Sequence, residues 1–154
     1  MLKPICEKKD YKRADEINNQ LVYKLKNKYP KMFKEVLEQK YCDIDGTFLG
    51  FMDTYYYLSK IVPKDWIIID FGCAYNAQSY YFRKHKKFIG IDLKHEIKKR
   101  FYFKNTKIFE GKISDYLKLN PPTEKNFAIC NNVPSKEIEL VRKYYPNCFV
   151  YYTA

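Results

Sequence analysis

Two acidic residues and one glycine have the types and spacing of a nucleotide-binding site. They lie in WIIIDFGCAYNAQSYYFRKHKKFIGIDL, residues 66–93, where one apolar run leads into Asp70 and Gly72 and a second ends near Asp92. Glycine lets the backbone turn sharply and lets a ligand approach closely. Amides at the start of a following helix can bind an anionic group, and an acid about twenty residues later can hold two ribose hydroxyls. This spacing favours a nucleoside cofactor, and a β-α-β unit without a ligand is the alternative.

The elements that must position these residues form a repeating pattern after residue 63. Short apolar runs alternate with polar segments of helical composition; the runs are WIIID, KFIGID, KIFEG, FAICN and CFVYYT. Strands that are apolar almost throughout and alternate with helices indicate a parallel sheet covered by helices on both faces. Because each crossover should be right-handed, the simplest topology is a doubly wound sheet of about five strands in the order 3-2-1-4-5. We therefore expect an α/β fold, with helices in NAQSYYFRKHK, KHEIKKRFYFKN, ISDYLKLN and SKEIELVRKYY between the strands.

The first part of the chain is expected to form a helical cap on this sheet. Apolar residues at helical spacing on both sides of Pro30 predict two helices or one kinked helix over residues 10–41. A further helix is expected over residues 47–61. The 154 residues have the length of one domain, so we expect residues 1–62 as the cap and residues 63–154 as the core of a single domain.

The chain is strongly basic, with 29 Lys and Arg against 18 Asp and Glu, for a net charge of +11. Such an excess attracts polyanions. Residues 83–118 contain 12 of the basic residues and 4 acids, which makes nucleic acid the first partner to consider for this region. The 16 tyrosines and 11 phenylalanines could supply stacking surfaces for bases. The alternative is that the lysines only solvate helix faces and the aromatic rings fill the core.

The cysteines and histidines do not have the spacing that is typical of a metal site. The five cysteines are widely spaced without a CxxC pair and are expected to be free thiols, while His85 and His95 lie among lysines and are expected to be solvated. No stretch approaches the roughly eighteen consecutive apolar residues that a membrane span needs, and the amino terminus becomes charged before a signal-peptide core could form. We therefore expect a cytoplasmic protein without a membrane partner.

The loop that follows the first apolar run resembles the first motif of class I S-adenosylmethionine-dependent methyltransferases, whose fold is Rossmann-like. That motif has an acid, any residue and then glycines at alternate positions. Here Asp70, Gly72, Ala74 and Asn76 lie in this register. The resemblance covers roughly residues 50–154. Family members usually continue into a sixth and a seventh strand, so this chain resembles a degenerate and truncated form of the family.

The resemblance implies a role for residues at the ends of the first two strands. Gly72, Cys73 and Ala74 would pass under the methionine part of S-adenosylmethionine. Asp70 would orient the loop or contact the ammonium group of the cofactor. Asp92 would bind the ribose.

Residues after the third and fourth strands also receive roles from the resemblance. Lys112 and Ile113 would border the adenine, although many family members have an acid at the position of Lys112; Asp115 is a nearby substitute. Asn131 would face the methionine end of the cofactor or the methyl acceptor. Its surroundings, NNVPS, lack the second proline and the aromatic residue with which related enzymes hold an amino group of a base. No catalytic residue is therefore assigned.

Two other interpretations of the loop stay open. The stretch GCAYNA also matches a degenerate GxGxxG of dinucleotide-binding folds through Gly72, Ala74 and Ala77, but Asp70 argues against it because those folds usually keep this part of the strand apolar. In the second interpretation the chain is a catalytically inactive methyltransferase-fold module of a mobile element or virus, which binds or inhibits a nucleic acid or protein partner. In the methyltransferase interpretation of the loop, the chain methylates nucleic acid or a small molecule.

Overall fold

The computed structural model describes residues 11–39, 52–93 and 97–153. Within them, five strands form one parallel sheet in the order β3-β2-β1-β4-β5, which confirms the predicted α/β topology. The strands are β1 (Ile67–Phe71), β2 (Lys87–Asp92), β3 (Thr106–Glu110), β4 (Asn126–Val133) and β5 (Cys148–Thr153). Because all five run the same way, their carboxyl ends share one edge of the sheet, here named the carboxyl edge, and their amino ends share the opposite, amino edge.

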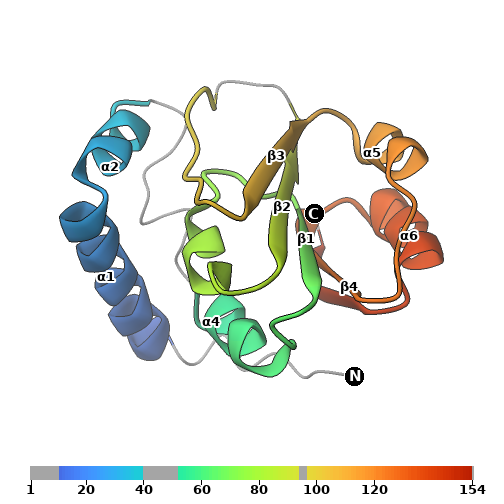
Figure 1. Ribbon diagram of the computed structural model, residues 1–154, viewed down its shortest axis with the longest axis horizontal. Coiled ribbons are helices and arrows are strands. Elements are labelled where there is room, and N and C mark those ends of the chain that lie inside the picture. The colour runs from blue at the N-terminus through green and yellow to red at the C-terminus, as the bar shows by residue number, and fades with distance from the viewer. Residues whose placement is uncertain (1–10, 40–51, 94–96, 154) are drawn as a thin grey trace.

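Helices cover both faces of the sheet, as Figure 1 shows. One face carries α1 (Tyr11–Lys28), α2 (Pro30–Leu37), α4 (Met52–Ile61) and the short 3₁₀ helix η1 (Ala77–Phe82); the other carries α5 (Ile113–Leu119) and α6 (Ser135–Tyr144). The central strand shows why its sequence is continuously apolar. Ile68 packs into the hydrophobic cluster under α1, α4 and η1, whereas Ile69 and Phe71 pack into the cluster under α5 and α6. Both faces of β1 are therefore buried.

The amino-terminal helices have the predicted break at Pro30, which separates α1 from α2. Leu21 and Leu25 of α1 are buried, as are Phe33 and Val36 of α2, and all four join the cluster on the first face of the sheet. The helix predicted to begin at residue 47 is described from Met52, and its first predicted turn lies outside the described residues. The division into a cap and a core of one domain stays a prediction.

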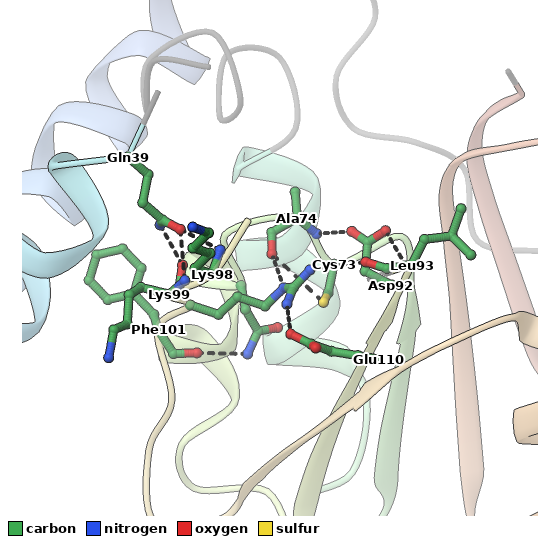
Figure 2. A network of polar contacts seen from close by, with 11 residues as sticks. Gln39, Cys73, Ala74, Asp92, Leu93, Lys98, Lys99, Phe101 and Glu110 are labelled. Atoms are coloured by element: carbon green, nitrogen blue, oxygen red, sulfur yellow. Dashed lines mark hydrogen bonds and ion pairs between the residues drawn. The ribbon is translucent and has the colours of Figure 1, made fainter. Parts of the chain in front are cut away.

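The connection between β2 and β3 differs from the prediction. The sequence favoured a helix over residues 94–105, but the described part of this segment has no helix. Its backbone is hydrogen-bonded to other elements instead: the side-chain oxygen of Gln39, after α2, accepts the N–H groups of Lys98 (2.6 Å) and Lys99 (2.7 Å), and the Gln39 amide donates to the Lys99 carbonyl (2.6 Å) (Figure 2). The Phe101 N–H donates to the loop after β1. These long-range partners replace the bonds within a helix. The predicted helix after β1 is likewise only the short η1.

The expectation for His85 was wrong. Its side chain is buried, its ring centre lies 5.2 Å from that of Phe82, and its Nε2 lies 3.0 Å from the carbonyl oxygen of Val62. Burial lowers the pKa of His85. His95 lies outside the described residues.

The described residues include three of the cysteines, Cys73, Cys130 and Cys148, and all three are free thiols. No group of three or more His, Cys, Asp or Glu side chains within the described ranges is arranged to hold a metal ion. Among the helices that the structure describes, none is long and apolar enough to cross a membrane.

Candidate functional site

The loop after β1 turns through three residues with positive φ. The angles are +83° at Gly72, +47° at Ala74 and +63° at Asn76. Glycine adopts this region without strain, and asparagine tolerates it better than most residues. These are the three alternate positions at which the methyltransferase motif usually has glycine. The backbone thus has the conformation for which glycine is suited, although two of the three glycines are replaced.

Gly72 brings this loop into contact with both neighbours of β1. Its N–H donates to the carbonyl of Ile91 on β2 (2.8 Å), and the N–H of Cys73 donates to the same carbonyl (3.1 Å). A Cβ at Gly72 would lie 2.9 Å from the backbone oxygen of Asn131 on β4. The loop therefore occupies the point where the sheet order changes direction, between β2 and β4. In open parallel sheets this is the place where ligands bind.

Gly90 is a second glycine that this loop requires, and the sequence analysis missed it. A Cβ at Gly90 would lie 2.7 Å from Oδ1 of Asn76 and 2.9 Å from Sγ of Cys73. The missing side chain on β2 therefore leaves room for the loop to lie against the strand. A glycine inside the apolar run KFIGID was the available signal, because such a glycine often marks a close approach of another segment.

Asp92 lies beside the loop at the end of β2, as its spacing predicted. Its Oδ2 accepts the N–H of Ala74 at 2.8 Å, and its Oδ1 accepts the N–H of Leu93 at 2.8 Å (Figure 2). A carboxylate oxygen has two lone pairs, so these two amides do not by themselves exhaust the capacity of Asp92 to accept hydrogen bonds. The side chain is half-buried at the carboxyl edge. Asp92 therefore fixes the loop after β1 against the end of β2.

Asp70, at the end of β1, holds the loop after β1 in place from the protein interior. It is fully buried, and its carboxylate accepts hydrogen bonds from the Tyr55 hydroxyl (2.9 Å) and from Nε2 of Gln78 (2.6 Å). The same Gln78 nitrogen donates to the carbonyl of Cys73 (2.9 Å), which links Asp70 to the loop. Burial raises the pKa of Asp70 to about 7, and its two hydrogen bonds act against this rise. Of the two roles implied for Asp70, these contacts support the orientation of the loop.

Asn131 closes the site on the β4 side. It is 9% exposed, and its Oδ1 is buried without a hydrogen-bond partner among the described residues. Burial and the charge of Asp70 raise the pKa of the Tyr55 hydroxyl, and the Asn131 side chain acts against this rise. An unpaired buried acceptor is unusual and needs an explanation, such as a bound group that donates to it.

Arg100 connects the three strand ends, and the sequence analysis counted it only as one of many basic residues. It is buried; its Nε donates to the carbonyl of Ala74 (2.9 Å), and its Nη1 pairs with the Glu110 carboxylate (2.5 Å) at the end of β3. Its Nη2 lies 3.5 Å from the carbonyl of Leu93. Figure 2 labels three residues that Arg100 contacts, Ala74, Leu93 and Glu110. Arg100 is therefore part of the interior of the site and does not belong to the basic surface.

The turn after β3 approaches the site through its backbone. The N–H of Gly111 donates to the backbone oxygen of Asp92 (2.8 Å), which holds this turn against the end of β2. Lys112 is exposed at the start of α5, whereas the side chain of Ile113 is buried in the cluster under α5 and α6. Asp115 is exposed as the third residue of α5, in its first turn. The structure thus brings the predicted site residues to one edge, but the Ile113 side chain packs into the core.

Comparison with known proteins shows the fold alone. No family model and no curated protein matches this chain. A candidate caffeoyl-CoA O-methyltransferase from Staphylococcus aureus, known from its crystal structure, is similar, with a TM-score of 0.51 and 13% sequence identity. The similarity covers 86% of this chain and 68% of that protein. The chain therefore has a Rossmann-like fold similar to that of a methyltransferase.

Proposed function

We propose that this protein binds S-adenosylmethionine at the carboxyl edge of its sheet, as a methyltransferase-like protein. The observation that carries the proposal is the left-handed loop over residues 72–76, whose Ala74 amide lies 2.8 Å from the carboxylate of Asp92. This loop and this acid meet at the point where the sheet order reverses, where nucleoside cofactors bind in doubly wound folds.

The residues at this edge fit the chemical groups of the cofactor. Asp92 would hold the ribose hydroxyls, and Leu93, which follows it and is 54% exposed, offers an apolar surface for the adenine ring. At the other end of the site, the buried Oδ1 of Asn131 needs a donor, and the ammonium group of the methionine part can supply one. Between these two ends, the absence of a side chain at Gly72 lets the loop lie directly against β4, where a Cβ would come within 2.9 Å of the Asn131 backbone oxygen.

The proposal covers binding and positioning. When bound, S-adenosylmethionine supplies a methyl group on a positively charged sulfur, and its transfer depends mainly on alignment of donor and acceptor. Within the chain, Asp92 would orient the ribose, and Asp70 would keep the loop in place through Gln78. Neither the substrate nor a general base is assigned, and the alternative of an inactive module with the same fold is an outcome of the test below.

Isothermal titration with S-adenosylmethionine and S-adenosylhomocysteine tests the proposal. We expect micromolar binding of both ligands. Asp92→Asn keeps an oxygen that can accept the Ala74 amide but removes the charge that faces the ribose, so binding should weaken about 10- to 100-fold, as expected for loss of a charge-assisted hydrogen bond. Asp65→Asn is the matched control, because Asp65 is exposed and precedes β1 at the amino edge. This variant should bind like the wild type.

Three other results of the titration would contradict the proposal or part of it. A folded protein that binds neither ligand at millimolar concentration contradicts the proposal and favours a binding module without the cofactor. Equal affinity of the wild type and Asp92→Asn would show that Asp92 does not hold the ribose. Tighter binding of a nicotinamide dinucleotide would instead support the dinucleotide interpretation of the loop.

A further inference from the structure

The amino edge of the sheet, opposite to the proposed cofactor site, carries a cluster of basic side chains. Lys64 precedes β1 and Lys86 precedes β2, and their backbones meet where the Lys86 N–H donates to the Lys64 carbonyl (2.7 Å). The cluster, here named the basic cluster, comprises Lys60, Lys64, Lys84, Lys86, Lys87 and Lys107. These lysines come from the end of α4, from the turn after η1 and from the first residues of β2 and β3.

The basic cluster is electrostatically crowded. The pKa of Lys64 is lowered by burial first, and then by the charges of Lys60 and Lys84. The pKa of Lys87 is lowered by burial first, and then by Lys107. Repulsion of this kind arises where cations lie close together without enough acids between them. Such a surface attracts a ligand with several negative charges.

The acid next to this cluster is already paired. Asp65 follows Lys64 in the chain, and its carboxylate forms an ion pair with Lys125 at 2.6 Å. The hydrogen bond from Lys125 lowers the pKa of Asp65. Asp65 is therefore directed to a lysine outside the basic cluster. The charge of Lys86, within the basic cluster, acts on Asp65 less than Lys125 does.

An aromatic hollow opens at the same edge of the sheet. Its volume is about 720 Å³, and it is lined by Tyr29, Arg83, Tyr102, Phe103, Lys104 and Asn105. Tyr102 is 61% exposed, whereas the rings of Tyr29 and Phe103 pack edge to face with 5.0 Å between their centres. The Arg83 guanidinium lies 3.7 Å from the ring centre of Tyr80, and its Nε donates to the Tyr80 carbonyl (2.8 Å). The hollow thus combines fixed aromatic rings with an oriented planar cation.

The hollow and the basic cluster are parts of one surface. Arg83 of the hollow is followed in the chain by Lys84 of the cluster. Asn105, which also lines the hollow, donates from its side chain to the carbonyls of Phe82 and His85, each at 2.9 Å. These bonds tie the start of β3 to the turn that carries the lysines. The aromatic rings of the hollow and the lysines of the basic cluster are therefore carried by segments that hydrogen bonds join.

We propose that this surface binds single-stranded nucleic acid, with bases stacked in the aromatic hollow and phosphates held along the basic cluster. Single-stranded binding sites combine a positively charged groove with aromatic rings on which successive bases stack. An exposed ring such as Tyr102 can reach an unpaired base, whereas the bases of a duplex are stacked inside the helix. The basic cluster lies at the amino edge, opposite to the proposed cofactor site, whereas Tyr102 also lines a second hollow with Arg100 and Glu110 beside that site. Separate variants therefore test the two proposals, Asp92→Asn for the cofactor and Lys86→Gln for the nucleic acid.

Fluorescence anisotropy with a labelled 20-nucleotide single strand, as DNA and as RNA, tests the proposal on the full chain. The wild type should bind either strand or both more tightly than the matched duplex. Tyr102→Ala should weaken binding about tenfold, as expected for loss of one stacking ring. Tyr23→Ala is the matched control, because Tyr23 is 70% exposed on α1 and does not line the hollow. It should change the affinity less than about twofold.

A charge variant tests the role of the basic cluster. Lys86→Gln should weaken binding and lower the slope of log affinity against log salt by about one, because one phosphate contact is lost. Lys118 is an exposed residue of α5, on the other face of the sheet, so Lys118→Gln should leave the affinity and the salt slope unchanged. Equal losses in the two lysine variants, or in the two tyrosine variants, would overturn the proposal. So would failure to bind the single strands in low salt, tighter binding of the duplex, or competition by polyglutamate as effective as that by the unlabelled strand.

Discussion

Asp70 should make the stability of this protein depend on pH in a way that one substitution removes. The carboxyl group is fully buried, and burial raises its pKa from the ordinary 3.8 to about 7. The folded protein therefore binds this proton more tightly than the unfolded chain does. The contribution is most favourable below the unfolded pKa, and it is lost as the pH rises through the folded pKa.

The size of the effect follows from these two pKa values. A shift from 3.8 to about 7 corresponds to a loss of about 4 kcal/mol above pH 8, at 1.36 kcal/mol per pKa unit. Between pH 5 and pH 8 the same linkage predicts a loss of about 2–3 kcal/mol from the free energy of unfolding. Asp70→Asn replaces the carboxyl group by a neutral side chain of similar shape, so this part of the pH dependence should disappear.

Urea denaturation at several pH values between 5 and 8 measures the effect. The comparison uses the difference between wild type and Asp70→Asn, since the lowered pKa of His85 gives both proteins an opposite trend, a loss of stability as the pH falls below about 6.5. The amide loses one acceptor for Tyr55 or Gln78, which adds a cost that does not vary with pH. The slope of the difference, and not its absolute value, is therefore the test. Parallel profiles of the two proteins would refute the reasoning.

Two further substitutions test the packing of the site by urea denaturation. Gly90→Ala should destabilise the protein by about 1–3 kcal/mol, because its Cβ would meet Asn76 at 2.7 Å in the loop after β1. Gly111→Ala is the control and should cost less, because its Cβ would meet only the edge of the Phe109 ring. An equal or larger cost of Gly111→Ala would contradict the close packing of the loop on Gly90. Arg100→Gln removes a buried guanidinium that joins two loop carbonyls to a carboxylate, and should cost about 2–3 kcal/mol. Lys125→Gln breaks an exposed ion pair and should cost much less than Arg100→Gln. Similar losses in the two variants would rule out the bridging role of Arg100.

The strand order could be predicted because the central strands are buried on both faces, as β1 is, although the edge strand β3 is only half-buried. Burial on both faces makes the strands apolar almost throughout, and polar segments of crossover length between such strands leave few topologies. Asp92 could be placed beside the loop after β1 for a similar reason: strand ends in a parallel sheet share an edge, so spacing along the chain becomes proximity in space. The positive φ angles at Gly72, Ala74 and Asn76 agree with the motif register.

The roles of other residues depended on partners that are distant in the chain. Gly90 matters because a loop fourteen to seventeen residues earlier lies against it, and Arg100 because its guanidinium meets carbonyls and a carboxylate from three strand ends. The same long-range bonds override the helical pattern of residues 94–105, since Gln39 supplies partners for backbone groups that a helix would satisfy locally. The sequence by itself thus determined the order of the strands and which edge carries the acids. Only the tertiary structure decided which polar groups are buried and paired there, because desolvation and hydrogen bonding depend on neighbours that local periodicity does not specify.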